Sequence, residues 1–132
     1  ELNEAKVKTF GFYSPQGVYR LKLKNSDILS KFLPDKTAEY RDLDVVILHT
    51  LIIEHLLKIK PEEIENYVKY ERGIERAIEQ VKNGNFQFCF LMNPTRPSQV
   101  KEVAQQRGRM PQKSTDFYPK LLSGLVFYDL AG

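Results

Sequence analysis

The chain has a single cysteine and no long apolar run, and each absence excludes a class of protein. Cys89 by itself cannot form an internal disulfide or a multi-cysteine zinc site, which fits a reduced environment. The longest apolar segment, Val45–Leu57, is interrupted by polar residues and is shorter than the roughly 18 to 20 residues of a membrane span. Residues 1–10 are mixed and polar, unlike a signal peptide. We therefore expect a cytoplasmic protein that does not enter a membrane.

The net charge is also small, which argues against nucleic acid as a partner. Twenty Lys and Arg residues stand against seventeen Asp and Glu residues, a net charge of +3, whereas nucleic-acid-binding domains carry a strongly basic patch. The charge is nevertheless segregated. The stretch Arg96–Lys120 holds six basic residues and two acidic ones, and the middle of the chain is acidic. The basic third of the chain is where an anionic ligand is expected.

The length and the hydrophobic pattern predict one α+β domain. A chain of 132 residues, 42% of them hydrophobic, has enough core for a single domain over residues 1–132. Alternation of apolar and polar residues predicts a hairpin over Lys6–Lys24 and later strands, and helical periodicity predicts the remaining elements. The expected helices are Ser26–Phe32, Asp42–Lys58, a short one from Pro61, Gly73–Lys82 and Pro97–Arg107, and the expected later strands are Tyr67–Tyr70, Phe86–Met92 and Leu122–Leu130.

These elements predict a mixed β-sheet of about four or five strands with helices packed on one main face. Phe86–Met92 is apolar on both faces, so it should be a central strand. Asp42–Lys58 should be the central helix, because Ile47 and Leu51 interrupt its polar side. Its broad apolar face comprises Val45, Val46, Leu48, Ile52, Ile53, Leu56 and Leu57.

The central helix contains both histidines, and only His49 is a candidate for chemistry. The two lie six residues apart, about 240° around a helix, so they cannot hold one metal ion from one face. We predict no metal site. His49 falls within the apolar face, either as a core histidine bonded to a backbone carbonyl or a hydroxyl, or as a catalytic acid–base residue at the floor of a pocket. His55 is expected at the surface.

The segment Arg107–Lys120, RGRMPQKSTDFYPK, has the densest set of chemically useful side chains. Basic and hydroxyl groups in this spacing suit a phosphate or a carboxylate, and long ordered loops are often functional. The segment is not a P-loop, because Gln112 precedes Lys113 and a helix comes before it. A solvated positive loop is the alternative interpretation. The candidate ligand-binding residues are Arg109, Lys113, Ser114, Thr115, Tyr118 and Lys120.

Two other features have simpler explanations in the core. Cys89 lies in the middle of a predicted strand and is expected to be a small core residue, not a nucleophile. Phe86, Phe88 and Phe90 alternate as in platforms that stack single-stranded nucleic acid. On a central strand such aromatic residues are expected to be core.

Four strings of residues resemble a known family. They are LHTLIIEHLLKI at Leu48–Ile59, FQFCFLMNPT at Phe86–Thr95, QVKEVA at Gln99–Ala104 and RMPQKSTDFYPKLLSGLV at Arg109–Val126. Together they resemble the C-terminal part of the DUF-1015 family, bacterial and archaeal proteins of unknown function. The resemblance implies that the chain is the C-terminal portion of a longer protein. It also implies that His49, Glu54, His55 and the MPQKST segment belong to the family signatures. The chain departs from the family at Asp116-Phe117 and at Lys58, where glycine is usual.

Two functions follow as hypotheses. In the first, the loop 109–120 binds an anionic small molecule, as part of an active site completed by an N-terminal region if the protein is an enzyme. In the second, the chain is a non-catalytic interaction or scaffold domain, which pairs with a second copy or with the rest of the parent protein. No residue pattern identifies a reaction or a cofactor.

Overall fold

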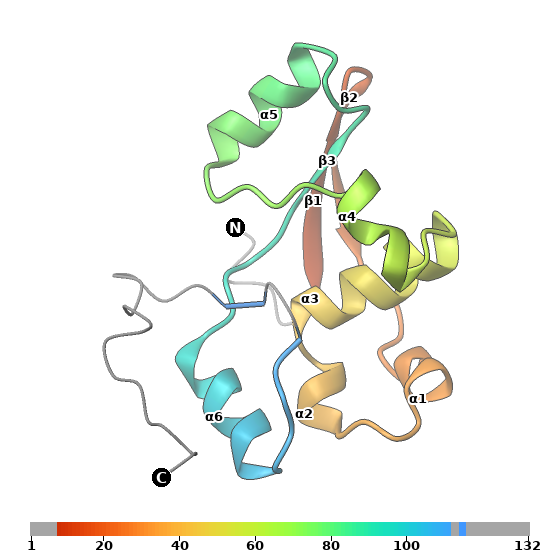
Figure 1. The fold of residues 1–132 in the computed structure, drawn as a ribbon, viewed down its shortest axis with the longest axis vertical. Coiled ribbons are helices and arrows are strands. Elements are labelled where there is room, and N and C mark those ends of the chain that lie inside the picture. The colour runs from red at the N-terminus through yellow and green to blue at the C-terminus, as the bar shows by residue number, and fades with distance from the viewer. Residues whose placement is uncertain (1–7, 112–113, 116–132) are drawn as a thin grey trace, which may run out of the picture.

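The computed structural model describes residues 8–111 and 114–115, and it combines an antiparallel sheet with helices. The strands are β1 (Thr9–Ser14), β2 (Gly17–Lys22) and β3 (Cys89–Leu91), in the order β2-β1-β3 (Figure 1). β1 and β2 form the predicted hairpin, in which Phe10 faces Leu21 and Phe12 faces Tyr19. The α+β class is thus confirmed.

The sheet of the described residues is smaller than the predicted one. β3 covers three residues of the expected strand Phe86–Met92, and it lies at an edge with β1 in the centre. Its prediction as a central strand is wrong for the described sheet, and four or five strands are not confirmed. The last predicted strand, Leu122–Leu130, lies outside the described residues.

The predicted strand Tyr67–Tyr70 is also wrong. Helix α4 occupies Ile64–Tyr67, and its last turn closes with a bond from the Val68 amide to the Ile64 carbonyl. Pro61 and the acidic residues after it start a helical turn that α4 continues. This local helical signal outweighs the aromatic residues at Tyr67 and Tyr70.

The other helices lie within the predicted helical segments, except α2, which was not predicted. Proline at the first helical turn starts α6, and Thr37 caps α2 by accepting a bond from the Tyr40 amide. The bounds are α1 Ile28–Phe32, α2 Ala38–Arg41, α3 Asp44–Ile47, η1 Leu48–Leu56, η2 Pro61–Glu63, α4 Ile64–Tyr67, α5 Ile74–Lys82 and α6 Pro97–Gln105. None of the helices in the described part of the chain has the length and apolar character needed to span a bilayer.

The predicted central helix is present, but most of it is a π-helix. After α3, the segment η1 winds more loosely, and the Leu57 amide bonds to the carbonyl of Ile52, five residues earlier. This changes the direction of each later side chain, so Leu56 is 67% exposed although α-helical periodicity placed it on the apolar face. The helix ends at Lys58, whose φ of 59° lies in the left-handed region that favours glycine.

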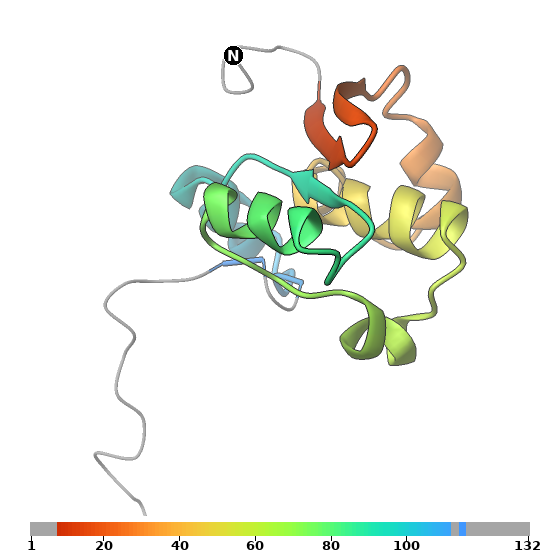
Figure 2. The ribbon, with the colours of Figure 1, turned by 90° about the horizontal axis from the view of Figure 1, so that it is seen from above.

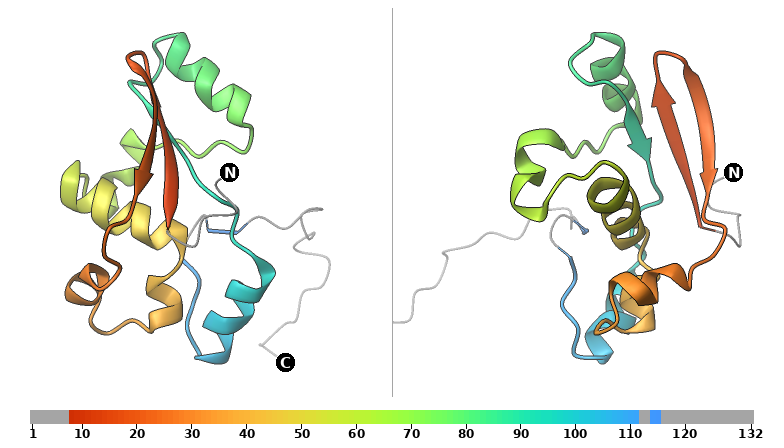
Figure 3. Two further views of the ribbon diagram at one scale, coloured as in Figure 1. Left: turned by 180° about the vertical axis from the view of Figure 1, so that it is seen from behind. Right: turned by 90° about the vertical axis from the view of Figure 1, so that its right-hand side faces the viewer.

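Two apolar clusters form the core. In the first, Phe10 of β1 packs with Leu29 of α1, Ile47 of α3 and Leu48 of η1, so these helices cover one face of the hairpin. Figure 3 shows that η1 crosses the end of the hairpin remote from its turn. The second cluster joins the start of α3 to α6 through Leu43, Val45, Val46 and Val103. α5 lies alongside β3 (Figure 2).

Candidate functional site

The loop that begins at residue 109 starts from a closely packed helix end. Arg107, with φ of 55°, is the left-handed residue, and the Gly108 amide bonds to the Val103 carbonyl at 3.0 Å. With the bond from the Arg107 amide to Ala104, this is a Schellman ending. Gly108 follows the end of the helix, and its backbone packs so closely on the last turn that a Cβ there would lie 3.0 Å from the Val103 carbonyl oxygen. The direction in which the loop leaves α6 is therefore fixed.

The first part of the loop is anchored to the rest of the molecule at two points and carries one internal hydrogen bond. Met110 packs against the cluster that contains Val45 and Val46. The Thr95 hydroxyl donates to the Ser114 carbonyl at 2.8 Å, and the Ser114 hydroxyl donates to the Pro111 carbonyl. The Ser114 proton is thus used inside the loop, which leaves its oxygen lone pairs and not its donor for a ligand.

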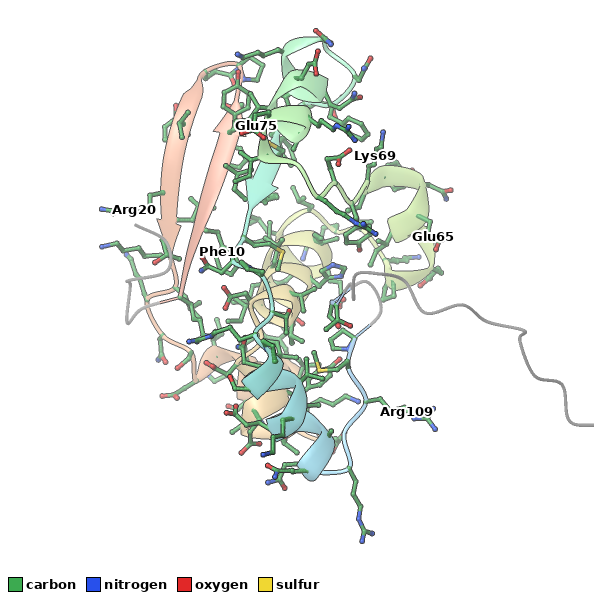
Figure 4. The ribbon with its side chains drawn as sticks, turned by 90° about the vertical axis from the view of Figure 1, so that its left-hand side faces the viewer. Phe10, Arg20, Glu65, Lys69, Glu75 and Arg109 are labelled. Carbon is green, nitrogen blue, oxygen red and sulfur yellow. The ribbon has the colours of Figure 1, made fainter. Side chains whose placement is uncertain are left out.

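The candidate ligand-binding residues divide into two groups. Arg109 is exposed and points away from the body of the molecule (Figure 4), and Thr115 is exposed as well. Within the described ranges 8–111 and 114–115, Arg109 has neither an ion pair nor a hydrogen bond. Lys113, Tyr118 and Lys120 lie outside the described residues.

His49 lies half-buried on η1 and bonds to a residue that sequence reasoning did not select. Its Nε2 lies 3.1 Å from the Tyr70 hydroxyl, and the two rings stack with centroids 5.9 Å apart and planes 15° apart. Of the two interpretations of His49, the hydroxyl partner fits the first, whereas partial exposure fits the second. In the sequence Tyr70 stands out only as an aromatic residue among polar neighbours, and it was assigned to a predicted strand.

Burial controls the protonation of this pair. It lowers the pKa of His49 below its ordinary value, and it raises the pKa of Tyr70, which the negative charge of Glu65 raises further. Both shifts favour the neutral forms at neutral pH. A neutral imidazole beside a neutral phenol can accept a proton and can also donate one.

A second polar cluster was missed by sequence reasoning. The Lys8 ammonium lies 2.9 Å from a carboxylate oxygen of Asp42 and 3.1 Å from one of Asp44. The Asn93 amide donates to the other Asp44 oxygen at 3.3 Å. These bonds join the start of β1, the first turn of α3 and the segment after β3, which leads to Thr95 and the loop. Only the spatial pairing reveals the cluster, because its members are 36 and 49 residues apart.

Two further residues, His55 and Cys89, were considered for chemistry. His55 is exposed, as predicted, and its ring lies against that of Phe32 with centroids 4.8 Å apart. Cys89 is half-buried, and burial raises the pKa of its thiol, which disfavours the thiolate. Among the residues described, no three His, Cys, Asp or Glu side chains group closely enough to hold a metal ion.

Comparisons with known proteins identified no relative of the chain. No protein-family model, no curated protein sequence and no solved structure matches the chain.

Proposed function

We propose that the loop 109–120 binds the phosphate or carboxylate group of a small molecule. The observation that carries the proposal is the contrast between the anchored residues Met110 and Ser114 and the guanidinium of Arg109, which has no partner among the described residues. Ser114 and Met110 fix the chain on both sides of Pro111, while Arg109 is exposed and has no charged partner within residues 8–111 and 114–115. A fixed backbone lowers the entropy that a ligand must overcome.

The residue types of the loop suit an anion. Arg109 offers a planar fork of N–H donors, and Lys113 and Lys120 offer compact positive charges. Thr115 and Tyr118 add hydroxyl donors, whereas Ser114 already donates its proton to the Pro111 carbonyl and adds no donor for the anion. The resemblance to the DUF-1015 family, if it holds, would place MPQKST within a family signature, and it would bring no activity with it.

His49 is the acid–base residue of the proposed site, and Tyr70 is its hydrogen-bond partner. The support is their 3.1 Å contact and the pKa shifts that favour the neutral form of each. A neutral imidazole near a bound anion would exchange a proton with the ligand.

Calorimetry with inorganic phosphate and sulfate tests the proposal. Arg109→Ala and Lys113→Ala should each weaken binding about tenfold or more, since each removes a charge-assisted contact. Lys101→Ala removes an exposed positive charge from α6 and serves as the matched control, with unchanged affinity expected. If neither anion binds, or if Lys113→Ala binds as well as the wild type, the proposal is wrong.

The exposed apolar residues beside η1 favour a second function, docking to another protein chain. Leu56 is 67% exposed, and next to it the ring of His55 contacts Phe32 of α1, itself partly exposed together with Ile28. Apolar groups gathered at one place are typical of an interface. If this function holds, sedimentation should show self-association that Leu56→Lys removes and that Val18→Lys, at a 71% exposed position of β2 outside this surface, does not. A monomer at every concentration would exclude pairing with a second copy.

A further inference from the structure

The sheet face that carries Phe10 is covered at one end only. At the end remote from the hairpin turn, Phe10 is buried under Ile47 and Leu48. Towards the turn the same face carries Phe12, Tyr19, Phe88 and Phe90, of which none is fully buried. Figure 3 shows η1 beneath the far end of the hairpin and away from the turn. The helices thus leave an aromatic half-face open.

The aromatic rings on this half-face form one connected group. The ring of Phe12 lies 5.4 Å from that of Phe88, 5.2 Å from that of Phe90 and 6.1 Å from that of Tyr19. Such distances are those of ordinary aromatic contacts, so the rings hold one another in place. Tyr19 is the outermost member, at 50% exposure. Phe90 also packs against the first core cluster, as predicted, whereas Phe88 lines an opening beside the hairpin turn.

A shallow cavity of about 560 Å³, largely open to solvent, lies at this place beside the hairpin turn. Phe12, Tyr19 and Phe88 line it with aromatic surface, and Ser14, Gln16 and Gln87 line it with polar groups. The tight turn shapes the rim of the cavity. Gly17, which follows Gln16, has a φ of 148°, a backbone conformation that residues with a side chain rarely adopt. Its volume falls within the range of small-molecule sites.

We propose that this cavity binds a neutral planar heteroaromatic group, namely the nucleobase of a nucleoside. None of the described residues that line it is charged, so it offers no ion-pair partner to a charged ligand. Exposed aromatic faces favour a flat ring that stacks. The two glutamine amides each supply a donor and an acceptor, the pattern that the edge of a base requires.

This site is independent of the proposed anion site. It involves the hairpin turn and the start of β3, whereas the loop 109–115 leaves α6 at the other end of the molecule (Figure 1). A probe without a phosphate group therefore tests it alone.

Titration of the protein with adenosine, followed by ¹H–¹⁵N NMR, tests the proposal. The side-chain amides of Gln16 and Gln87 should shift and reach saturation. Tyr19→Ala, at an exposed position, should weaken binding about tenfold. Arg20→Ala is the matched control on the other sheet face, and it should leave the affinity unchanged, as should Arg109→Ala.

Several results would overturn the proposal. One is the absence of saturable shifts up to about 10 mM adenosine, and another is an equal affinity in Tyr19→Ala. Equal shifts with ribose alone would show that the base is not what binds. Shifts of the same amides on dilution without adenosine would assign the half-face to a second copy of the chain. Wild-type dispersion of amide signals in Tyr19→Ala confirms that the variant is folded.

Discussion

At the scale of single residues, His49 is a titratable side chain in a half-buried position. Burial lowers its folded-state pKa below the unfolded value of about 6.5. Between these two values the unfolded chain binds more protons than the folded one, so stability rises with pH in that window. The contribution of neutral His49 to the free energy of unfolding is present above about pH 6.5, and it is lost as the pH falls towards the lowered pKa of the folded state.

We therefore expect His49→Gln to flatten part of this pH dependence. Glutamine keeps a hydrogen-bonding partner for Tyr70 but cannot be protonated. Urea unfolding at about pH 7.5 and about pH 5 should show a smaller loss of stability in the variant than in the wild type. His55→Gln, at an exposed position, is the control and should behave as the wild type. The same loss in all three proteins would contradict the prediction.

Lys58 has a left-handed backbone conformation that is unfavourable for residues with a side chain. Its φ of 59° costs a non-glycine residue about 1 to 2 kcal/mol, which the extra chain entropy of unfolded glycine offsets by about 0.4 to 1 kcal/mol. Lys58→Gly should therefore raise the free energy of unfolding by up to about 1 kcal/mol. Lys60→Gly provides the comparison, because Lys60 has an ordinary extended conformation. A gain from Lys60→Gly equal to that from Lys58→Gly would refute the explanation.

At the scale of elements, the π-helix η1 decides which apolar side chains reach the core. An α-helix over Asp42–Lys58 would bury both Ile53 and Leu56, whereas in the structure Ile53 is buried and Leu56 is exposed. π-helical segments are frequent at functional sites, and η1 contains His49. The looser winding is thus the reason that the periodic pattern fails in the second half of this helix.

Truncation of these two residues distinguishes the two helical forms. Ile53→Ala should lower the free energy of unfolding by about 2 to 5 kcal/mol through the cavity it leaves. Leu56→Ala should change it by less than about 0.5 kcal/mol, as at other surface positions. Chemical denaturation measures both. Large losses in both variants would indicate a regular α-helix.

At the scale of the whole molecule, the Lys8 cluster holds distant segments together. Asp44, whose side chain is 13% exposed, bonds both to Lys8 before β1 and to Asn93 after β3. Asp42 meets the same lysine, but its side chain is 60% exposed. Partial burial makes the Asp44 contacts less screened by solvent than that of Asp42.

The two carboxylates should therefore differ in their effects. Asp44→Ala should lower the free energy of unfolding by about 1 to 3 kcal/mol, since it leaves the partly buried Lys8 and Asn93 without their shared acceptor. Asp42→Ala removes the same charge and should cost at most about 1 kcal/mol. Thermal unfolding of the two variants provides the comparison, and equal losses would show that the cluster does not hold the segments.

The sequence by itself determined the local elements. Alternation in β1 and β2, the Pro15–Gly17 turn, and proline and glycine at the ends of α6 act within a few residues, so the hairpin and most helices could be predicted. The sequence also indicated where the loop begins, and it singled out His49 as the histidine within the apolar face of the central helix.

Only the tertiary structure decided what meets across long separations. The pairing of His49 with Tyr70, of Asp44 with Asn93 and of Phe12 with Phe88 depends on how the elements pack, and no periodic pattern encodes it. The edge position of β3 and the winding of η1 are likewise set by neighbours in space. Residue patterns report the preference of a segment for one conformation, whereas the partners of a side chain are fixed by the packing of the whole chain.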